Sequence, residues 1–394
     1  WTQSRKRNGC LVEKNFINSS QTMKILADAH IPYLKGAIEH FGDVEYLPGN
    51  QFTKETVKDK DVLIVRTVTY FGEEILAGSS VKLICSATIG YDHIDTHYCD
   101  THGIAWRTAP GCNAGSVEQY VTASLLLMAE KKGFELKKKT IGIVGVGNVG
   151  SKVEAACKKL GMHVLLNDPP REEHEGNANN MFVDLETIKR KSDIITLHTP
   201  LTKTGKYKTW HLVDEFFFNE LENNPILINS CRGSVTDNNA WKKAIKENRV
   251  SGSIIDCWEN EPRIDKELLG MADIATPHVA GYSADGKWTA TKMTLENLCD
   301  FFHFDIDPVK LMPPIPPPPN PIIDLKGVGP EKQILHAILH TYNPLKETLA
   351  LKNSPEKFYY FRSHYPLRRE YKAYTVKNAD LINADLLKQL GFTV

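Results

Sequence analysis

The stretch TIGIVGVGNVGSKVEAACKKLGMHVLLND, residues 140–168, decides the fold of this chain. An apolar run leads into a glycine-rich turn, an amphipathic run follows, and a second apolar run ends in an acidic residue. This is the pattern of a strand, a helix and a second strand. Gly145 permits a tight turn, Gly147 lets backbone approach a pyrophosphate, and Gly150 lets helix and strand pack closely. The stretch therefore predicts a βαβ unit that binds a dinucleotide.

Asp168 closes the second predicted strand of this unit. A carboxylate at this place bonds the adenosine ribose hydroxyls and repels a 2′-phosphate, so the residue favours NAD as the cofactor. Arg171 follows shortly after and keeps NADP as an alternative, because a nearby arginine accommodates a 2′-phosphate. A glycine-rich turn without any ligand is the remaining alternative.

Strand candidates continue on both sides of this unit. Upstream, KILAD, VEYL, VLIVR and KLICSAT are typical of strands, and PYLKGAIEHF (residues 32–41) of a helix between them. From residue 140 onward the strand candidates are TIGIVG, HVLLND, DIITLH, ILINS, GSIID and DIATP, a set that matches a complete dinucleotide-binding sheet. Alternation of strands and helices predicts parallel sheets, so the fold class is α/β with a Rossmann dinucleotide-binding domain.

Two segments mark the domain organisation. Ser116 and Gln119 stand at capping-box spacing before an apolar helical pattern, which predicts a long helix crossing between two domains. The proline-rich residues 313–321 predict an extended linker, followed by a unit with a helix (EKQILHAILHTY) and a strand (YKAYTVKN). The expected division is 1–22 as an extension outside the fold or a sequence artefact, 23–115 and 282–308 as a substrate-binding domain, 116–281 as the NAD-binding domain, 309–325 as a linker, and 326–394 as a C-terminal domain.

Composition excludes several classes of partner. The 48 basic and 48 acidic side chains cancel, so no bulk field draws the chain to nucleic acid or to an anionic membrane. No run of about 18 apolar residues is present, which argues against a membrane span. The eight cysteines are scattered without a CxxC pair, which indicates reduced thiols and a cytoplasmic protein.

Three polar residues follow successive predicted strands of the NAD-binding unit. Arg232 comes after ILINS, Glu261 after GSIID and His278 after DIATP. The carboxyl ends of parallel strands border the ligand crevice of such a sheet, so the three side chains are expected in one pocket. Taken singly, each has an ordinary structural explanation as a surface ion pair, a loop charge or one of 14 histidines. Their common position favours a catalytic set.

Oxidation of a 2-hydroxy acid requires these residue types. A histidine suits the general base because its unperturbed pKa lies near neutrality. An arginine holds a carboxylate through two parallel hydrogen bonds, and a glutamate orients the imidazole and stabilises the imidazolium that forms. We therefore assign His278 as the base, Arg232 as the carboxylate clamp and Glu261 as the orienting group. Oxidation needs the neutral imidazole and is expected to be faster above neutral pH.

The motifs GIVGVGNVG, HTPL, NSCRG, DCWENEP and TPHVAGY resemble those of the D-isomer-specific 2-hydroxyacid dehydrogenases. SATIGYDHID, APGCNAGSVEQYV, NDPPR and HVAGYSADGK, with the extra C-terminal domain, resemble the erythronate-4-phosphate dehydrogenase branch of that family. The resemblance runs from Met23 to the C-terminus and thins in the proline-rich linker. It implies a flavodoxin-like substrate domain and an α+β C-terminal domain that forms a homodimer.

The resemblance also implies an activity and a set of site residues. The activity is NAD-dependent oxidation of 4-phospho-D-erythronate in pyridoxal 5′-phosphate synthesis. D-glycerate, D-3-phosphoglycerate and D-lactate remain alternative substrates, and a non-catalytic NAD-sensing corepressor remains an alternative class. By motif match, Arg232, Glu261 and His278 fall on active-site positions. The positions implied for the cofactor are Gly145, Gly147, Asn148, Val149, Gly150, Asp168, Thr199, Asp256 and Gly281, and those implied for the substrate are Thr67, Thr88 and Tyr282.

Further expectations concern the remaining charged residues. Thr67 stands where the family pattern has serine, and Gly115 and Ser116 replace an apolar pair. Arg368 or Arg369 is a hypothetical contact to a substrate phosphate across the dimer, with surface charge as the alternative. No metal site is expected, and the polar cluster Asp92, His93, Asp95 and His97 is interpreted as structural.

Overall fold

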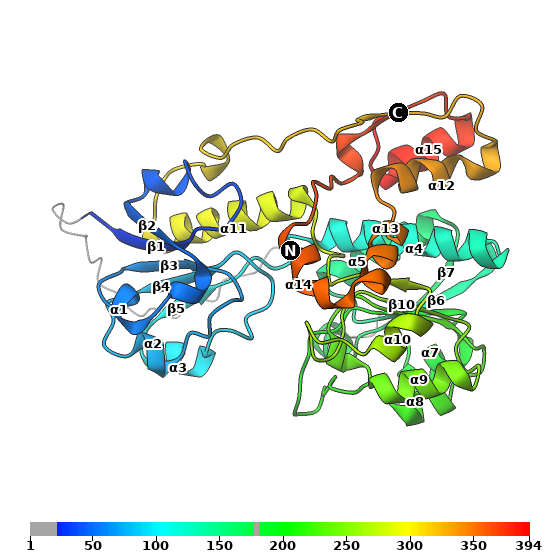
Figure 1. Cartoon of the computed structure of the whole chain (residues 1–394), viewed down its shortest axis with the longest axis horizontal. Helices are drawn as coiled ribbons and strands as arrows, with labels where there is room; N and C mark the ends of the chain where they lie inside the picture. The colour runs from blue at the N-terminus through cyan, green and yellow to red at the C-terminus, as the bar shows by residue number, and fades with distance from the viewer. Residues whose placement is uncertain (1–21, 177–180) are drawn as a thin grey trace.

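The computed structural model describes residues 22–176 and 181–394 (Figure 1). The expected extension, residues 1–22, lies outside the described residues except for Thr22. The described chain forms a 5-stranded sheet, a 6-stranded sheet and a small 2-stranded sheet. Figure 1 shows the two larger sheets in separate lobes, with the C-terminal unit over the lobe of the second.

The first sheet is built from short apolar runs, and its central strands are buried along their whole length. Parallel strands covered on both faces need such runs because neither face meets water. The order is β2-β1-β3-β4-β5, all parallel. This is the flavodoxin-like order, so the predicted flavodoxin-like domain is confirmed. Its elements are β1 (Lys24–Asp28), η1 (Ile38–His40), β2 (Asp43–Leu47), η2 (Gly49–Gln51), α1 (Lys54–Val57), β3 (Val62–Val65), α2 (Glu73–Leu76), β4 (Leu83–Ser86), α3 (Thr96–Thr101) and β5 (Ala105–Arg107).

The helix predicted over residues 32–41 is wrong. The segment forms turns and only the short 3₁₀ helix η1. Tyr33 has a φ of 63° and Gly36 a φ of 93°, both left-handed values that interrupt a right-handed helix. The buried side chains Leu34 and Ile38 still pack on the sheet. The apolar spacing was therefore a signal of burial, whereas the backbone geometry was not encoded in it.

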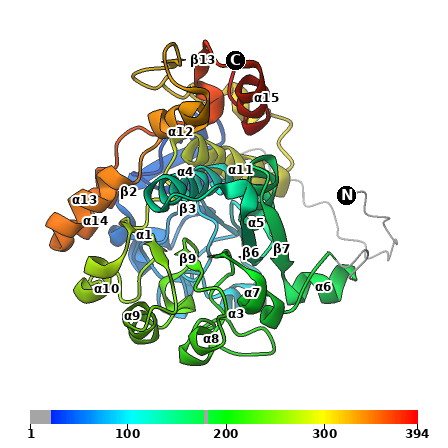
Figure 2. The same cartoon turned by 90° about the vertical axis from the view of Figure 1, so that its right-hand side faces the viewer.

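Two long helices connect the sheets. α4 (Ala114–Lys132) runs from the first sheet to the second, and α11 (Ala284–Phe302) returns from the second to the first. Leu295 and Leu298 of α11 share a core with Ile25 of the first sheet. α4 and α11 contact each other (Figure 2). The segment after the second sheet thus packs on the first.

The second sheet has the order β11-β10-β9-β8-β6-β7, all parallel. In the usual dinucleotide-binding order 3-2-1-4-5-6, β6, β7, β8, β9 and β10 take places 1, 2, 4, 5 and 6. Place 3 is reduced to a single bridge between Leu166 and Phe182, and β11 extends the sheet at the other edge. The six predicted strands are present, but the set lacks the usual third strand and includes β11 in addition. They are β6 (Thr140–Val144), β7 (His163–Asn167), β8 (Ile194–Leu197), β9 (Ile226–Asn229), β10 (Gly252–Ile255) and β11 (Ile274–Ala275).

Helices cover both faces of this sheet. Tyr120 of α4 and Val153 of α5 pack with Ile143 on one face. Trp241 of α9 and Leu268 of α10 belong to the core on the other face. The helices that flank the sheet are α5 (Asn148–Lys159), α6 (Pro169–Glu175), α7 (Leu185–Lys191), α8 (Glu215–Asn219), α9 (Asn238–Lys246) and α10 (Lys266–Met271), with the 3₁₀ helices η3 (Leu136–Lys138) and η5 (Gly233–Val235).

The C-terminal unit packs on the second lobe and covers its edge strand. Thr348 on α13 accepts a hydrogen bond of 3.0 Å from the backbone N–H of Ala275 in β11, which satisfies a donor that a sheet edge would otherwise expose. The unit consists of β12 (Ile322–Asp324), α12 (Pro330–Thr341), α13 (Leu345–Asn353), η7 (Pro355–Lys357), α14 (Phe358–Ser363), η8 (Tyr371–Ala373), β13 (Thr375–Lys377) and α15 (Leu381–Leu390). The 3₁₀ helix η6 (Pro308–Lys310) precedes the proline-rich segment and contacts α11.

The predicted linker is too long at its C-terminal end. Residues 313–321 carry no regular secondary structure, as the prolines dictate. Ile322–Asp324, however, is strand β12 and pairs with Thr375–Lys377, and Leu325 is buried in the shared core. The small sheet therefore begins where the prolines stop.

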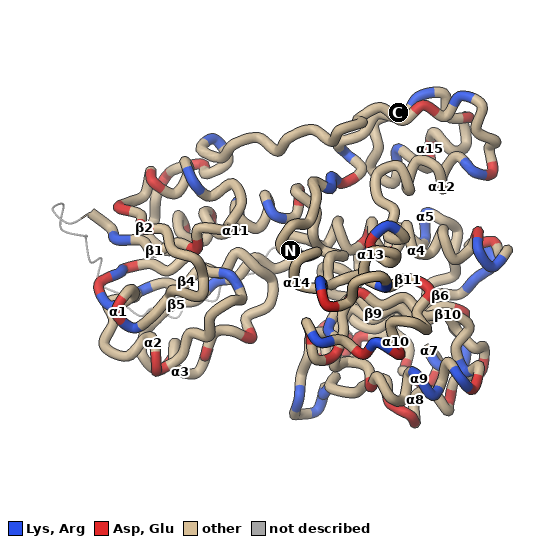
Figure 3. The backbone as a smooth tube through the Cα atoms, viewed as in Figure 1, with Lys and Arg blue, Asp and Glu red and all other residues tan. Residues whose placement is uncertain are grey.

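The surface charges are mixed in sign, and the described cysteines are unpaired. Lys and Arg alternate with Asp and Glu over both lobes (Figure 3), in keeping with the zero net charge. The cysteines in the described part of the chain are all free, and most are buried. A search of the described helices for one long and apolar enough to cross a membrane finds none.

Candidate active site

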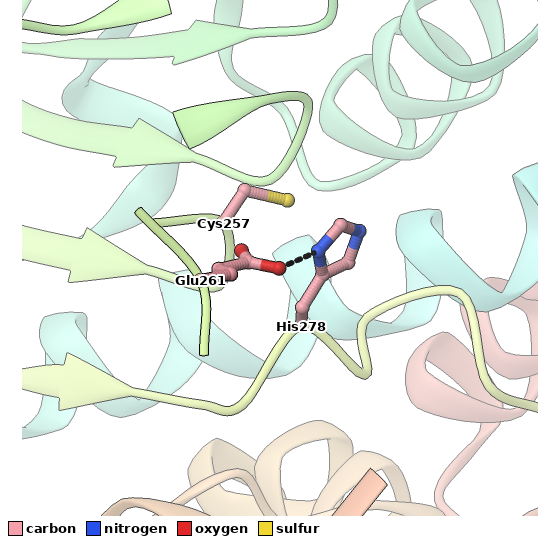
Figure 4. Close-up of side chains that lie close together, drawn as sticks. All are labelled: Cys257, Glu261 and His278. Carbon is pink, nitrogen blue, oxygen red and sulfur yellow. Dashed lines mark hydrogen bonds and ion pairs between the residues drawn. The ribbon is translucent and has the colours of Figure 1, made fainter. Parts of the chain in front are cut away.

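The three predicted catalytic residues follow adjacent parallel strands. Arg232 comes just after β9, Glu261 after β10 and His278 after β11, and these strands are neighbours in the sheet. All three residues therefore lie at the carboxyl ends of the strands, on the same side of the sheet. Figure 4 shows Glu261 and His278 pointing toward each other beyond the strand ends.

Glu261 and His278 form a hydrogen-bonded pair. Nδ1 of His278 lies 2.8 Å from Oε2 of Glu261, and the other carboxylate oxygen accepts a 2.8 Å hydrogen bond from the backbone N–H of Trp258. Burial alone would raise the pKa of Glu261, but His278 and the Trp258 N–H hold that pKa below its ordinary value. Glu261 is therefore an anion at neutral pH and orients the imidazole.

The backbone of the His278 loop is held by Asp256. This carboxylate is 1% exposed and accepts hydrogen bonds from Thr276 Oγ1 (2.6 Å) and from the N–H groups of Val279 (2.8 Å) and Ala280 (3.0 Å). Burial raises the pKa of Asp256. The structure places Asp256, a predicted cofactor contact, beneath the loop, where its hydrogen bonds hold the backbone on both sides of His278.

Arg232 faces the first lobe. Its guanidinium donates to the carbonyl of Cys231 at 2.8 Å, and Nη2 lies 4.0 Å from a carboxylate oxygen of Asp92. A Cβ on Gly90 would lie 2.7 Å from Nη2, so the guanidinium packs directly against this glycine. Thr88 donates to the carbonyl of Gly90 at 3.1 Å. The arginine and Thr88 thus meet at one loop, from opposite lobes.

The other predicted substrate residues are less tightly grouped. Thr67 follows β3 in the first lobe and is exposed. Tyr282 lies in the loop that follows His278. Its hydroxyl accepts a 2.9 Å hydrogen bond from Nη2 of Arg362. Arg362, on α14, also places Nη1 3.9 Å from Oε2 of Glu261.

Arg362 is a site residue that the sequence did not reveal. It lies in a short helix of the C-terminal unit, and no motif surrounds it. The arginines that sequence singled out, Arg368 and Arg369, have another role. Both are buried, which contradicts the hypothesis of a substrate contact across a dimer.

The two buried arginines bind their own chain. Arg368 donates to the carbonyls of Val279 (3.3 Å) and Ser116 (3.1 Å). Arg369 donates to both carboxylate oxygens of Asp285 at 2.9 and 3.3 Å. Neither guanidinium is free for a substrate, because packing of the C-terminal unit on α4 and α11 encloses them.

The predicted capping box at the start of α4 is also wrong. The N-cap is Asn113, without a side-chain cap. Ser116 instead donates to the carbonyl of Ala280 at 2.8 Å and accepts from the N–H of Ser283 at 3.0 Å. Gln119 donates to Thr341 and to the carbonyl of Arg369, each at 3.0 Å. Both polar side chains tie the helix to distant segments.

The glycine turn has the shape that a pyrophosphate requires. A Cβ on Gly145 would lie 2.7 Å from the carbonyl carbon of His198, and one on Gly150 only 2.0 Å from the carbonyl oxygen of Gly145. At Gly147 no atom lies within 4 Å of such a Cβ, so that side of the turn is open. Helix α5 starts here with Asn148 and Val149, and its uncapped N–H groups suit an anion.

The remaining cofactor candidates surround this turn. Asp168 accepts from the N–H of Val146 at 2.8 Å and caps α6. Arg171 is engaged by Glu175 at 2.9 Å and by the carbonyl of Val146 at 2.8 Å. Thr199 follows β8, directly against Gly145. Gly281 packs so closely on Asn113 that a Cβ would lie 2.2 Å from its Nδ2.

One group of potential metal ligands occurs in the described part of the chain, namely Cys257, Glu261 and His278, whose ligand atoms lie within 4.8 Å of one another (Figure 4). Burial, and next the charge of Asp256, raise the pKa of the Cys257 thiol well above its ordinary value. A neutral thiol is a poor ligand. We interpret the group as the Glu261–His278 pair packed against a buried thiol.

The cluster of residues 92–97 has structural contacts. Asp95 caps α3 by accepting from the N–H of Tyr98 at 2.9 Å. His93 is buried with Nε2 3.0 Å from Ser86 Oγ, and burial lowers the pKa of His93 to about 4.

Comparisons with known proteins agree with this geometry. Residues 114–280 match the family model described as "D-isomer specific 2-hydroxyacid dehydrogenase, NAD binding domain", and residues 315–391 match a domain of unknown function. The chain is 49% identical over 355 residues to an erythronate-4-phosphate dehydrogenase of Bacteroides thetaiotaomicron, covering 90% of this chain and 99% of the relative. For that of Porphyromonas gingivalis the identity is 44% over 371 residues, with 94% and 100% covered.

Solved structures share the fold. D-lactate dehydrogenase from Aquifex aeolicus, complexed with NAD and lactic acid, superposes with a TM-score of 0.59 at 23% identity and covers 75% of this chain and 100% of that one. The NAD⁺-bound 3-phosphoglycerate dehydrogenase of Entamoeba histolytica gives 0.59 at 26% identity, with 74% and 98% covered. With its Rossmann sheet, its paired Glu261 and His278 and these relatives over most of its length, the chain belongs to the erythronate-4-phosphate dehydrogenase family of D-isomer-specific 2-hydroxyacid dehydrogenases.

Proposed function

We propose that this protein oxidises 4-phospho-D-erythronate to (R)-3-hydroxy-2-oxo-4-phosphobutanoate with NAD, a step of pyridoxal 5′-phosphate (vitamin B6) synthesis. The observation that carries the proposal is the 2.8 Å contact between His278 and Glu261 at the carboxyl ends of the NAD-domain strands. The names of relatives at up to 49% identity supply the substrate. D-lactate, D-glycerate and D-3-phosphoglycerate are the alternative acids that the experiment below compares.

His278 acts as the general base. Glu261 is an anion and accepts only, so the neutral imidazole carries its proton on Nδ1 and leaves Nε2 free to take the proton of the substrate's C2 hydroxyl. Arg232 holds the substrate carboxylate through its guanidinium fork and polarises the carbonyl as it forms. NAD, when bound, accepts the hydride that leaves C2. The imidazolium formed on His278 is stabilised by the Glu261 charge.

NAD would lie along the open side of the glycine turn. Gly145, Gly147 and Gly150 shape the turn, and the N–H groups of Asn148 and Val149 would hold the pyrophosphate. Asp168 would bond the adenosine ribose hydroxyls, and its negative charge would repel a 2′-phosphate. Thr199, Asp256 and Gly281 line the nicotinamide end in this proposal. Thr67, Thr88 and Tyr282 complete the substrate site.

We assign the protomer three parts. Residues 23–115 and 282–308 form the substrate-binding domain, 116–281 the NAD-binding domain, and those after the proline-rich segment a dimerisation domain. Support for a homodimer comes from apolar side chains left exposed on the last domain, among them Leu349 (64%), Leu381 (90%) and Ile382 (83%). Light scattering during gel filtration tests it: a single species of twice the 44.3 kDa chain mass is expected, and a monomer contradicts it. Free, mostly buried cysteines support a cytoplasmic location.

The first experiment measures NADH formation with 4-phospho-D-erythronate, D-glycerate, D-3-phosphoglycerate and D-lactate offered separately. A 2-oxo acid is also supplied, in case bound NADH limits turnover. The highest kcat/KM is expected for 4-phospho-D-erythronate. A preference for another acid would keep the roles of Arg232, Glu261 and His278 but overturn the substrate. Failure with every acid would overturn the activity.

A further inference from the structure

Tyr282 lies between two cations close to the proposed catalytic pair. Nζ of Lys287 is 5.1 Å and Cζ of Arg362 is 5.5 Å from the centre of the Tyr282 ring. Arg362 also donates to the Tyr282 hydroxyl at 2.9 Å. Lys287 comes from α11 and Arg362 from α14. The packing of two distant segments thus brings two positive charges to one aromatic ring.

A single carboxylate, that of Glu261, lies near these two charges. Lys287 makes no ion pair with any described residue, and its ammonium group lies over the Tyr282 ring. The carboxylate nearest to Arg362 is Glu261, 3.9 Å away, and that group already accepts from His278 and Trp258. Nε of Arg362 is buried and has no hydrogen-bond partner among the described residues. Burial, and next the charge of Arg368, lower the pKa of Lys287. Both disfavour the charged ammonium group, which a bound anion would stabilise.

The position of Arg362 relative to Arg232 gives the anion a place in the substrate. Arg232 follows β9, Glu261 follows β10, His278 follows the edge strand β11, and the C-terminal unit that carries Arg362 packs on that edge. The segments that carry the two arginines therefore lie on opposite sides of those that carry Glu261 and His278. If Arg232 holds the carboxylate and His278 the C2 hydroxyl, the other end of the substrate points toward Arg362.

We propose that Arg362 and Lys287, together with the Tyr282 hydroxyl, form a subsite for the phosphate monoester of the substrate. This inference rests on the proposed function and deepens it. In 4-phospho-D-erythronate the phosphate is attached two carbons beyond C2, which matches a subsite adjacent to His278. A guanidinium fork and an ammonium suit a phosphate dianion, and a tyrosine hydroxyl adds a neutral donor. The subsite explains how this family member separates a phosphorylated acid from lactate with the same catalytic residues.

A purely structural role for Arg362 predicts something different. The arginine adds to the lowering of the Glu261 pKa, so its loss could act through the base, irrespective of what the substrate carries. The two roles separate when the substrate phosphate itself is removed. Substitution of a phosphate ligand impairs only the phosphorylated substrate, whereas substitution of a positioning residue impairs both substrates alike.

The experiment compares 4-phospho-D-erythronate with D-erythronate, which lacks the phosphate, in wild type, Arg362→Gln, Arg362→Lys and Lys287→Met. For Arg362→Gln we expect kcat/KM with the phosphorylated substrate to fall about 10- to 100-fold, mainly through KM, as for loss of a charged hydrogen bond. With D-erythronate it should change less than about 2-fold. Arg362→Lys should recover part of the loss, and Lys287→Met should lose about 10-fold. Lys292→Gln, on the same helix in a surface pair with Glu296, is the matched control and should match wild type.

Equal losses with both substrates, or no loss in either variant, would overturn the subsite. A second measurement is independent of turnover: calorimetric titration of inorganic phosphate into the protein without NAD. Wild type should bind phosphate, and Arg362→Gln and Lys287→Met should each bind it more weakly. If wild type binds phosphate in this way but oxidises no 4-phospho-D-erythronate, the proposed function fails and the subsite stands. If wild type oxidises it while both variants keep full phosphate binding and selectivity, the subsite fails and the function stands.

Discussion

Oε2 of Glu261 lies 2.8 Å from Nδ1 of His278, while Oε1 accepts from the backbone N–H of Trp258 at 2.8 Å. Both carboxylate oxygens are thus committed, one to the protein backbone and one to the imidazole. The arrangement fixes the rotation of the carboxylate and, through it, the plane and tautomer of His278. Proton transfer by this site depends on that order of donors and acceptors.

Replacing His278 should remove the general base. We choose His278→Asn because His278 has a φ of 55°, which asparagine tolerates. NADH formation should fall by about 10²- to 10⁴-fold. His211→Asn is a matched control, since His211 also pairs with a glutamate (Glu259, 2.8 Å) and has a φ of 51°. Wild-type turnover by His278→Asn would eliminate the proposed role.

Glu261→Gln should act through the tautomer. The glutamine oxygen still accepts from Trp258, so its NH₂ group faces Nδ1 of His278, which must then accept and carry its proton on Nε2. That nitrogen no longer takes a proton from the substrate, and kcat should drop about 10²- to 10⁴-fold with little change in KM. Because the pKa of Glu261 is held below its ordinary value of 4.5, its ionisation should not shape the wild-type profile near neutrality. A kcat within a few-fold of wild type would show that Glu261 does not set the tautomer.

Arg369→Met should destabilise the protein without raising KM. The substitution removes the main partner of Asp285, a carboxylate that is 1% exposed, and loss of one member of a buried pair costs about 3 kcal/mol or more. Glu154→Gln breaks the surface pair with Lys158 and should cost less than about 1 kcal/mol. Thermal unfolding measures both. An increase in KM for 4-phospho-D-erythronate with unchanged stability would restore Arg369 as a substrate contact.

The Asp285–Arg369 pair also predicts a pH dependence of stability. Although burial acts to raise the pKa of Asp285, Arg369 and the Glu370 N–H hold it below its ordinary value of 3.8. A carboxyl with a depressed folded pKa stabilises the fold above the unfolded value and loses that contribution as the pH falls through the folded one. The difference in Tm between wild type and Arg369→Met should therefore be largest at neutral pH and shrink in acid. A difference that is constant across this range would show that the stabilisation is not ionic.

Asp168→Asn should relax the choice of cofactor. The carboxylate faces the glycine turn through Val146 at 2.8 Å and repels a 2′-phosphate. We expect kcat/KM with NAD to fall by about 10-fold and the preference for NAD over NADP to shrink, because the charge is lost while the shape stays. Asp184→Asn, at the cap of α7, is the control. Unchanged discrimination in Asp168→Asn would assign specificity to another group.

The positions of the strands could be predicted from the sequence because each strand depends on the residues within it. Parallel strands covered on both faces must be continuous apolar runs, and the six in the second sheet all appeared where such runs lie. The loops that follow β9, β10 and β11 all lie at the carboxyl ends of these strands, so the places of Arg232, Glu261 and His278 could be predicted as well. Residues 32–41 failed because burial spacing does not encode the left-handed values of Tyr33 and Gly36.

What only the tertiary structure decided is which distant segment covers the edge of the second sheet. Arg362 reaches Tyr282, and Thr348 reaches Ala275, through packing of the C-terminal unit on β11. Arg368 and Arg369, adjacent in sequence and apparently free, are enclosed by the same packing. Local sequence determines strands, turns and the side chains at their ends, because these depend on neighbouring residues. Contacts between elements far apart in the chain depend on how whole surfaces fit, and that information is spread over residues with no common motif.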